Sequence, residues 1–324
     1  MAVVITGGYG LLGSWLTHAF ARDGEKVLVL DVVGRDLDYL EEYRDRIEFE
    51  QVDVLDFPQL AEIFSKRRGS VDGIIHTVAA MATPSFWANP HHSTRLNVMG
   101  TVNLLEAARQ FEIGRFLFVS SGAVYGELEV SAHELRNPVQ PSDLYGASKA
   151  SGEFIASQYG RHYGIDVRCV RPFFFFGPGK LPSEMPHLFT NLLGPLEGLQ
   201  GLELQKGADQ RLGFTYVKDT ARGTYLLYRA ERLRHRTMNV AAESAVSFAD
   251  MVRLARECSD TPTDVALGPG KLFPRGETLD ISLAREELGF NPIYSVEEGM
   301  REYGEWVRRN RALRGDSGRK QERL

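Results

Sequence analysis

The sequence is poor in cysteine and has no long apolar run. Its 324 residues include only Cys169 and Cys258, which are too few for a disulfide framework and lack the spacing of a metal site. We expect both thiols to be buried and reduced, as in the cytoplasm. No stretch of 18 apolar residues occurs, so no membrane-spanning helix is predicted. The start of the chain lacks the basic region of a secretory signal.

An excess of charge of one sign is also absent. Lys and Arg total 38, Asp and Glu total 43, and the formal net charge is −5. This balance creates no field that would hold nucleic acid or an anionic membrane, so we expect neither as a partner. Hydrophobic residues make up 43% and charged residues 25% of the chain, as in globular proteins. The length predicts about two structural units.

Short apolar runs alternate with amphipathic segments in the first half of the chain. The uniform apolarity of the runs is typical of strands buried on both faces of a parallel sheet. Between them, Leu11–Arg22 and Asn97–Phe111 have the apolar spacing of a helix face. We therefore predict an α/β fold, with a Rossmann-type doubly wound parallel sheet over residues 1–172. The expected strands are Ala2–Thr6, Lys26–Asp31, Ile47–Val54, Val71–Val78, Arg115–Ser120 and Val167–Arg171.

The pattern changes after Pro172, where proline and glycine become frequent. Residues 173–309 are expected to form a smaller C-terminal α/β lobe, although later segments could return to the first domain. Residues 310–324 are basic and are expected to be a disordered tail. The helices expected in the lobe are His187–Leu193, Val217–Arg229, Phe248–Cys258 and Val296–Val307, and its short, isolated strands are Gly213–Val217 and Thr237–Val240.

A glycine pattern follows the first expected strand and opens the first helix. Gly7, Gly10 and Gly13 form G-x-x-G-x-x-G. Glycine is needed where the chain turns tightly, where backbone approaches a phosphate, and where helix packs on strand. The free amides and the helix dipole then favour a pyrophosphate. This position in a βαβ unit predicts a dinucleotide site.

Two acidic positions bear on the identity of the dinucleotide. Asp31 ends the second expected strand, 18 residues after Gly13. A carboxylate there accepts hydrogen bonds from ribose hydroxyls and repels a 2′-phosphate, so NAD is favoured over NADP. Arg35 could weaken that preference. Asp53 and Val54 end the third expected strand and either meet the adenine or, in the case of Asp53, cap the strand.

A second constellation combines a tyrosine, a lysine and a serine. Tyr145 and Lys149 share one helical face at i and i+4. A nearby ammonium would lower the tyrosine pKa from about 10 and allow proton exchange with a substrate hydroxyl. Ser120 and Ser121 follow the fifth expected strand, on the edge where such sheets bind ligands.

In this order the motifs resemble the extended short-chain dehydrogenase/reductase family, and more narrowly its NAD-dependent epimerase/dehydratase group. The resemblance runs from Ala2 to about Arg309. It implies that Ser121 orients the substrate hydroxyl, Tyr145 is the acid/base, and Lys149 holds the nicotinamide ribose. It also implies a homodimer through helices near Asn97–Phe111 and Asp143–Tyr163. Supporting matches are His76–Ala80, Asn97–Thr101, Arg171–Pro172, Phe176–Pro178, Arg211, Val217–Asp219, Asp280–Ser282 and Leu288–Phe290.

The resemblance further assigns residues to NAD and to a small-molecule substrate, and implies no metal. Val119 precedes Ser120 and Ser121 and has no hydroxyl, so it is not expected to bind the cofactor through its side chain. The expected cofactor residues are Gly7, Tyr9, Gly10, Leu11, Leu12, Gly13, Asp31, Asp53, Val54, Val78, Ala79, Ala80, Asn97, Tyr145, Lys149 and Pro172. The expected substrate residues are Met81, Thr83, Ser121, Gly122, Ala123, Phe174, Arg211 and Arg275.

Departures from the family pattern narrow the expected chemistry. Dehydratases of the family carry an Asp-Glu pair where Gly122 and Ala123 stand, and decarboxylases keep the Glu. Neither reaction is therefore expected. Hydride transfer to NAD remains, ended by return of the hydride in an epimerase or by release of a ketone in a dehydrogenase. A non-catalytic NAD-binding protein is the alternative from another class.

The substrate is less constrained by the sequence. Phe174 replaces an Asn that is usual in nucleotide-sugar members. Gly270 and Lys271 stand where those members place a diphosphate-binding Arg, while Arg275 lies nearby. A lysine point charge does not reproduce a bidentate arginine. A nucleotide sugar and a smaller sugar acid, polyol or secondary alcohol both remain open.

Overall fold

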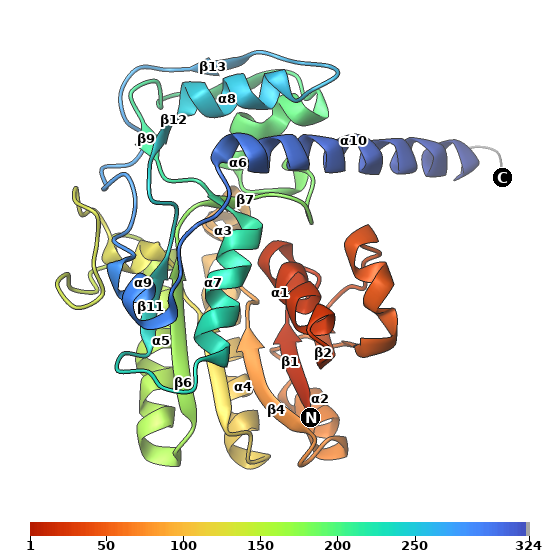
Figure 1. The fold of residues 1–324 in the computed structure, drawn as a ribbon, viewed down its shortest axis with the longest axis vertical. Helices are drawn as coiled ribbons and strands as arrows, with labels where there is room; N and C mark the ends of the chain where they lie inside the picture. Colours follow the sequence, from red (N-terminus) through yellow and green to blue (C-terminus); the bar gives the residue numbers. More distant parts are fainter. Residues whose placement is uncertain (322–324) are drawn as a thin grey trace.

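The computed structural model describes residues 1–321, and a seven-stranded parallel sheet forms its centre (Figure 1). The strand order is β3-β2-β1-β4-β5-β6-β11. The order reverses between β1 and β4, which places the ligand crevice of such a sheet outside the carboxyl ends of these strands. The predicted Rossmann-type α/β fold is confirmed. The strands are β1 (Ala2–Thr6), β2 (Lys26–Asp31), β3 (Ile47–Gln51), β4 (Val71–His76), β5 (Arg115–Val119), β6 (Asp166–Pro172) and β11 (Thr237–Val240).

The seventh strand corrects one sequence expectation. Thr237–Val240 was expected to be an isolated strand of the second lobe, but it pairs in parallel with β6. Met238 and Val240 are fully buried there. The run joins the large sheet because an apolar strand satisfies its backbone and buries its side chains best against the otherwise open edge of β6.

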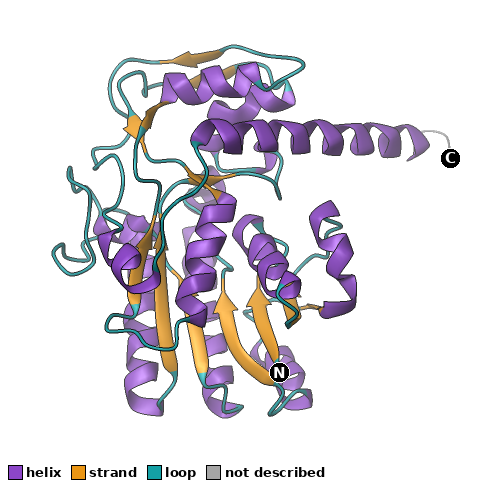
Figure 2. Ribbon diagram, in the orientation of Figure 1, coloured by secondary structure: helices purple, strands orange, loops and turns teal. Residues whose placement is uncertain are grey.

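Helices cover both faces of this sheet (Figure 2). The side chains of β1 show how the faces differ, since Val3 and Ile5 join one hydrophobic cluster and Val4 joins the other. This alternation follows from the two-residue period of a strand. Helices α1 (Leu11–Arg22) and α7 (Val217–Arg229) contribute to the first cluster. Helices α2 (Phe57–Lys66), α4 (Pro90–Gln110) and α5 (Leu144–Tyr163) contribute to the second.

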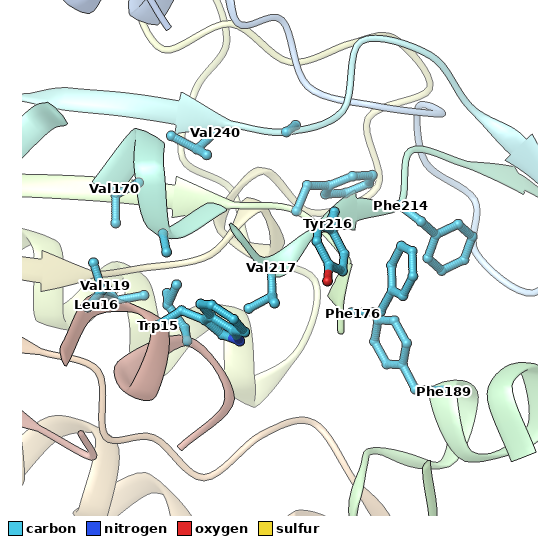
Figure 3. Packing of buried hydrophobic residues seen from close by; sticks show 14 of the residues in the cluster. Trp15, Leu16, Val119, Val170, Phe176, Phe189, Phe214, Tyr216, Val217 and Val240 are labelled. Carbon is cyan, nitrogen blue, oxygen red and sulfur yellow. The ribbon is translucent and has the colours of Figure 1, made fainter. Parts of the chain in front are cut away.

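The elements beyond β6, apart from α7, α9 and β11, form a second lobe at one end of the sheet (Figure 1). Its core is continuous with the first cluster: Trp15 and Leu16 of α1 lie in the same cluster as Phe176, Phe189 and Phe214 (Figure 3). The two lobes therefore share one apolar core. The remaining elements are α3 (Pro84–Ala88), β7 (Phe175–Phe176), α6 (His187–Leu193), β8 (Leu202–Leu204), β9 (Arg211–Leu212), β10 (Thr215–Tyr216), β12 (Val246–Ser247), α8 (Phe248–Glu257), β13 (Val265–Leu267), α9 (Ser282–Leu288) and α10 (Val296–Gln321).

Helix α10 is longer than expected. It was expected to end at Val307, but it continues to Gln321 and so includes most of the segment expected to be a disordered tail. The sequence after Val307 contains no proline and several arginines, which favour helix. Residues 322–324 of that segment lie outside the described residues.

The segments that lead to the ligand edge also differ in length from expectation. Strands β3, β4 and β5 end at Gln51, His76 and Val119, which is one to three residues before the ends expected from the sequence. The residues that follow them therefore lie in loops, where neighbouring strands separate. Helix α4 begins before Asn97, because the side chain of Asn89 caps it by accepting a hydrogen bond from His92 N (3.1 Å).

Two other expectations concern cysteines and membranes. Both cysteines are free thiols, and Cys169 is buried as expected. The expectation of burial is wrong for Cys258, which is partly exposed where it ends α8. No helix among residues 1–321 combines the length and apolarity that a bilayer crossing requires.

Candidate active site

The glycine loop builds a cradle at the start of α1. Gly10 N donates to the carbonyl of Gly7 (2.8 Å), and Gly7 has φ +66°. A Cβ on Gly13 would lie 2.0 Å from that same carbonyl oxygen, so only glycine fits. No side chain caps the amides that open α1. These unblocked amides, which include those of Leu11 and Leu12, and the positive end of the helix fit a pyrophosphate.

Asp31 lies beside this cradle at the end of β2. Its carboxylate accepts hydrogen bonds from Tyr9 N (3.1 Å) and Val32 N (2.8 Å), which fixes it next to the glycine loop. Asp53 instead accepts from Leu55 N (2.9 Å), the geometry of the strand-end cap. Val54 is buried against α4.

Asn97 supports the loop after β4. Its side chain accepts from Ala80 N (2.7 Å) and donates to Ala80 O (3.1 Å) and to the Ser148 hydroxyl (2.9 Å). Val78 contacts the glycine loop, since a Cβ on Gly7 would lie 3.1 Å from its methyl group. The structure therefore brings the Val78–Ala80 loop, the glycine loop and α5 together at one edge of the sheet.

The three expected catalytic residues are also adjacent. Ser121 follows β5 and lies next to the phenol of Tyr145 on α5, and its hydroxyl accepts a hydrogen bond from Ala123 N (3.1 Å). Lys149, one turn further along α5, donates from Nζ to the carbonyl of Val119 (2.8 Å) and lies 5.0 Å from the ring of Phe118. Ser120 Oγ is buried without a partner.

Burial shifts the pKa values of this pair in opposite directions. Desolvation raises the pKa of Tyr145 to about 12, although the neighbouring Ser121 hydroxyl lowers it. Desolvation lowers the pKa of Lys149 to about 7, while Glu153 raises it. The expected lowering of the Tyr145 pKa by the ammonium is wrong, because Lys149 is bonded to the carbonyl of Val119 and burial dominates.

His76, by contrast, is a packed imidazole. It is fully buried between Thr6 and Thr101, whose hydroxyls lie 2.8 and 3.2 Å from its two ring nitrogens. Burial, together with the charge of Lys149, lowers its pKa to about 3. It is therefore neutral near pH 7 and carries no charge into the site.

Packing at Gly122 leaves no room for a side chain. A Cβ there would lie 2.8 Å from a ring carbon of Phe173 and 3.1 Å from a methyl group of Leu279. Ala123 follows in the short 3₁₀ helix η2 (Gly122–Tyr125). An acidic residue at Gly122 would require Phe173 and Leu279 to move.

Three of the expected substrate residues lie in two places. Met81 and Thr83 follow β4, and Phe174 lies in an aromatic cluster. Met81 is 41% exposed, and its sulfur accepts from the hydroxyl of Tyr145 at 3.7 Å. Thr83 bonds the hydroxyl of Ser85 (2.7 Å). Phe174 packs on other rings rather than standing alone, with centroid distances of 4.7 to 6.2 Å to Phe173, Phe273, Phe214 and Phe189.

The two expected substrate arginines differ in their surroundings. Arg211 donates to the carbonyl of Ala245 (2.6 Å) and lies 3.6 Å from Glu277, so its charge already has partners. Arg275 lies over the ring of Phe273 at 5.3 Å, and its Nε is buried without a hydrogen-bond partner. No hydrogen bond or ion pair within the described residues links either arginine to Tyr145.

Sequence reasoning missed a buried ion pair next to this site. Arg171 donates to both carboxylate oxygens of Glu153 on α5 (2.8 and 2.6 Å) and to the hydroxyl of Tyr125 (2.7 Å). Pro172 follows it at the end of β6. The Arg-Pro sequence marks the strand end, but nothing local identifies Glu153 as its partner. The pair fixes α5, and so Lys149, against the sheet.

Comparison with known proteins decides the family. A family model described as "NAD dependent epimerase/dehydratase family" matches residues 3–241. The chain belongs to the NAD dependent epimerase/dehydratase family.

Members of this family resemble the chain over nearly its full length. A dTDP-glucose 4,6-dehydratase of Streptomyces antibioticus is 29% identical, covering 96% of this chain and 94% of that protein. A UDP-glucuronate 4-epimerase of Thermodesulfobacterium geofontis is 25% identical, covering 95% and 96%. The solved structure of Thermus thermophilus UDP-glucose 4-epimerase in complex with NAD is 26% identical, with TM-score 0.82, covering 95% and 99%.

The enzyme uses NAD, as its family does and as its NAD-bound structural neighbours indicate. The residues present fit that cofactor, since the glycine loop excludes any Cβ from the cradle and Asp31 lies beside it. Gly7, Gly10 and Gly13 would hold the pyrophosphate, and Asp31 the adenosine ribose.

The lowered pKa of Lys149 predicts a pH dependence of stability. Between pH 7 and 10.5 the unfolded chain holds a proton on this residue that the folded, cofactor-free protein has lost. Stability therefore rises with pH in that interval, by up to about 1.4 kcal/mol per pH unit. We expect Lys149→Met to flatten this slope. The free energy of unfolding would be measured by urea unfolding of protein freed of NAD, from about pH 7 to 8.5, because cysteine thiols ionise mainly above that range. The exposed Lys206→Met should keep the slope, and an unchanged slope in Lys149→Met would contradict the prediction.

Proposed function

We propose that this enzyme oxidises a secondary alcohol of a sugar-like substrate by hydride transfer to NAD and then returns the hydride to the opposite face, as an epimerase. The observation that carries the proposal is the convergence of Ser121, Tyr145 and Lys149 at the sheet edge beside a glycine-lined cradle. NAD, when bound, supplies the hydride acceptor.

The chain's own residues would handle the proton. Tyr145 Oη takes the proton of the substrate hydroxyl, and Ser121, which lies beside that phenol, orients the same hydroxyl. Lys149 holds the nicotinamide ribose, which requires its Nζ to exchange the Val119 carbonyl for a ribose hydroxyl. A protonated Lys149, one helical turn from Tyr145, would then stabilise the phenolate of Tyr145.

The packing at Gly122 supports an epimerase over a dehydratase or a decarboxylase. Elimination of water needs an acid and a base beside the catalytic hydroxyl, and Gly122 and Ala123 can move no proton. The aromatic and aliphatic contacts of Gly122 leave no space for another side chain from that position. A dTDP-glucose 4,6-dehydratase whose structure was solved in complex with NAD shares the fold, so the difference in reaction would lie in this pair.

A nucleotide sugar is the substrate class that the similar proteins favour, since UDP-glucose and UDP-glucuronate epimerases are among them. Residues 173–309 would form most of the lobe that binds this substrate. The aromatic surroundings of Phe174 and the partnered charge of Arg211 favour the second candidate, a net dehydrogenase acting on a sugar acid, polyol or other alcohol without a nucleotide.

Product analysis separates these reactions. We expect incubation with UDP- and dTDP-sugars to yield an isomer of unchanged mass with no net NADH. NADH formed in equal amount with a ketone, from free sugar acids or polyols, would instead establish the dehydrogenase. Loss of water or of carbon dioxide from the sugar would contradict both.

The mechanism predicts the effect of removing one hydroxyl. Tyr145→Phe should lower the turnover rate by about 10²- to 10⁴-fold, because general acid/base catalysis is lost, while NAD binding measured by calorimetry stays within about twofold. Tyr159→Phe is the matched control on the same helix, since its hydroxyl bonds Glu106 outside the site. Full activity in Tyr145→Phe would refute the mechanism.

A homodimer through α4 and α5 is part of the proposal. These helices expose large apolar side chains, with Met99 45% and Phe154 60% exposed, as expected of a contact surface. We expect a dimer in light scattering and a monomer for Phe154→Glu. Ile293→Glu, at an equally exposed position on another surface, should leave the dimer intact, and a monomeric wild type would exclude this assembly. The two free cysteines favour a cytoplasmic location.

A further inference from the structure

An arginine close to the NAD site is held by the second lobe. Arg35 lies four residues after Asp31, at a distance along the chain where it could meet a 2′-phosphate. Its guanidinium instead donates to the carbonyl of Gly179 (3.1 Å) and to both carboxylate oxygens of Glu184 (3.0 and 3.1 Å). The two side chains are only 21% and 30% exposed, so solvent screens their pairing less than that of a surface pair.

A second cation belongs to the same cluster. Lys180 is partly buried, and burial lowers its pKa. Arg35 lowers the pKa of Lys180 further, whereas Glu184 and Asp31 raise it, so its ammonium lies within the fields of all three groups. Lys180 is therefore a second cation close enough to the Arg35–Glu184 pair to be affected by its charges.

The backbone that carries Glu184 is held firmly on α1. Trp15 Nε1 donates to the carbonyl of Pro178 (2.7 Å). A Cβ on Gly179 would lie 2.9 Å from the Tyr39 hydroxyl, so this segment lies directly on the first lobe. Glu184 also accepts from Leu181 N (2.8 Å), which closes its own turn. Several contacts therefore position the Glu184 carboxylate, and its hydrogen bonds in turn position the Arg35 guanidinium.

We propose that Glu184 is a specificity-determining residue that, with Asp31, excludes NADP by holding Arg35. A 2′-phosphate needs a cation to replace its water, and an arginine near the end of β2 is the usual one. Glu184 neutralises that arginine, so Arg35 is not available to a phosphate at Asp31. The sequence places Arg35 as a potential NADP residue, and the ion pair withdraws it from that role.

Equilibrium binding to the full chain, freed of bound nucleotide, tests this inference without any turnover. In Glu184→Gln we expect NADP affinity to rise by about tenfold while NAD affinity stays within about twofold, the effect of one unit charge near a phosphate. Adding Arg35→Ala to Glu184→Gln should abolish the gain. Glu184→Asp, which keeps the charge but shortens the side chain, should keep the exclusion of NADP.

The controls distinguish specificity from a simple contact between lobes. Glu25→Gln removes another carboxylate that bonds an arginine across the chain, Arg229 of α7 (2.8 Å), and should change neither affinity. Unchanged NADP binding in Glu184→Gln would overturn the inference. Equal changes for NAD and NADP would also overturn it, as would a gain that persists without Arg35. If Glu184→Gln fails to fold, Glu184→Ala, which also removes the charge, replaces it: the same gain in NADP affinity would support the inference, and unchanged NADP binding would overturn it.

Discussion

The close approach of Gly13 to the carbonyl of Gly7 determines where α1 lies. Because neither position carries a side chain, the helix begins directly on the end of β1 and its first amides remain uncovered. The same helix places Leu16 in the core of the sheet and Trp15 against the second lobe, where its indole bonds Pro178. One contact that depends on the absence of a Cβ therefore sets the cofactor cradle and the joint between the lobes.

Around Tyr145 and Lys149, burial has more influence on the pKa values than pairing. Tyr145 and Lys149 lie on one helical face, yet desolvation makes the phenol a weaker acid and the ammonium a stronger one. The neutral His76 and the internally paired Arg171 and Glu153 add no net charge. The site is thus an apolar environment in which a cationic cofactor and its ribose would have a large effect on both proton equilibria.

The motif-bearing parts of the fold were predictable from sequence because their physics is local. The glycine spacing, the apolar strands and the Tyr-Lys spacing each depend on neighbours in the chain, and the doubly wound parallel sheet and the family are as expected. The roles assigned to individual residues stay predictions. The destination of Thr237–Val240 could not be predicted, since an apolar strand does not specify which open edge it will cover.

The same limit applies to long-range charges. Arg35 and Glu184 are far apart in sequence, and no spacing rule joins them, although the ion pair determines whether Arg35 is free. The Tyr145 pKa was misjudged for a related reason, because burial is a property of the packed site and the Lys149 ammonium has the Val119 carbonyl as an alternative partner. Local pattern identifies the chemical groups, and the tertiary structure decides their charge states and partners.

The return of β11 to the sheet has a consequence for how the chain matures. During synthesis, β6 is complete long before Thr237–Val240 is made, so its outer edge presents unpaired amides and carbonyls while the second lobe is still being translated. A nascent chain that stalls or is cleaved within the second lobe would retain an unpaired β6 edge, on which a strand of another chain could pair. Once made, β11 covers that edge with a strand of only four residues, and the backbone amide of its Asn239 donates to the carboxylate of Glu134.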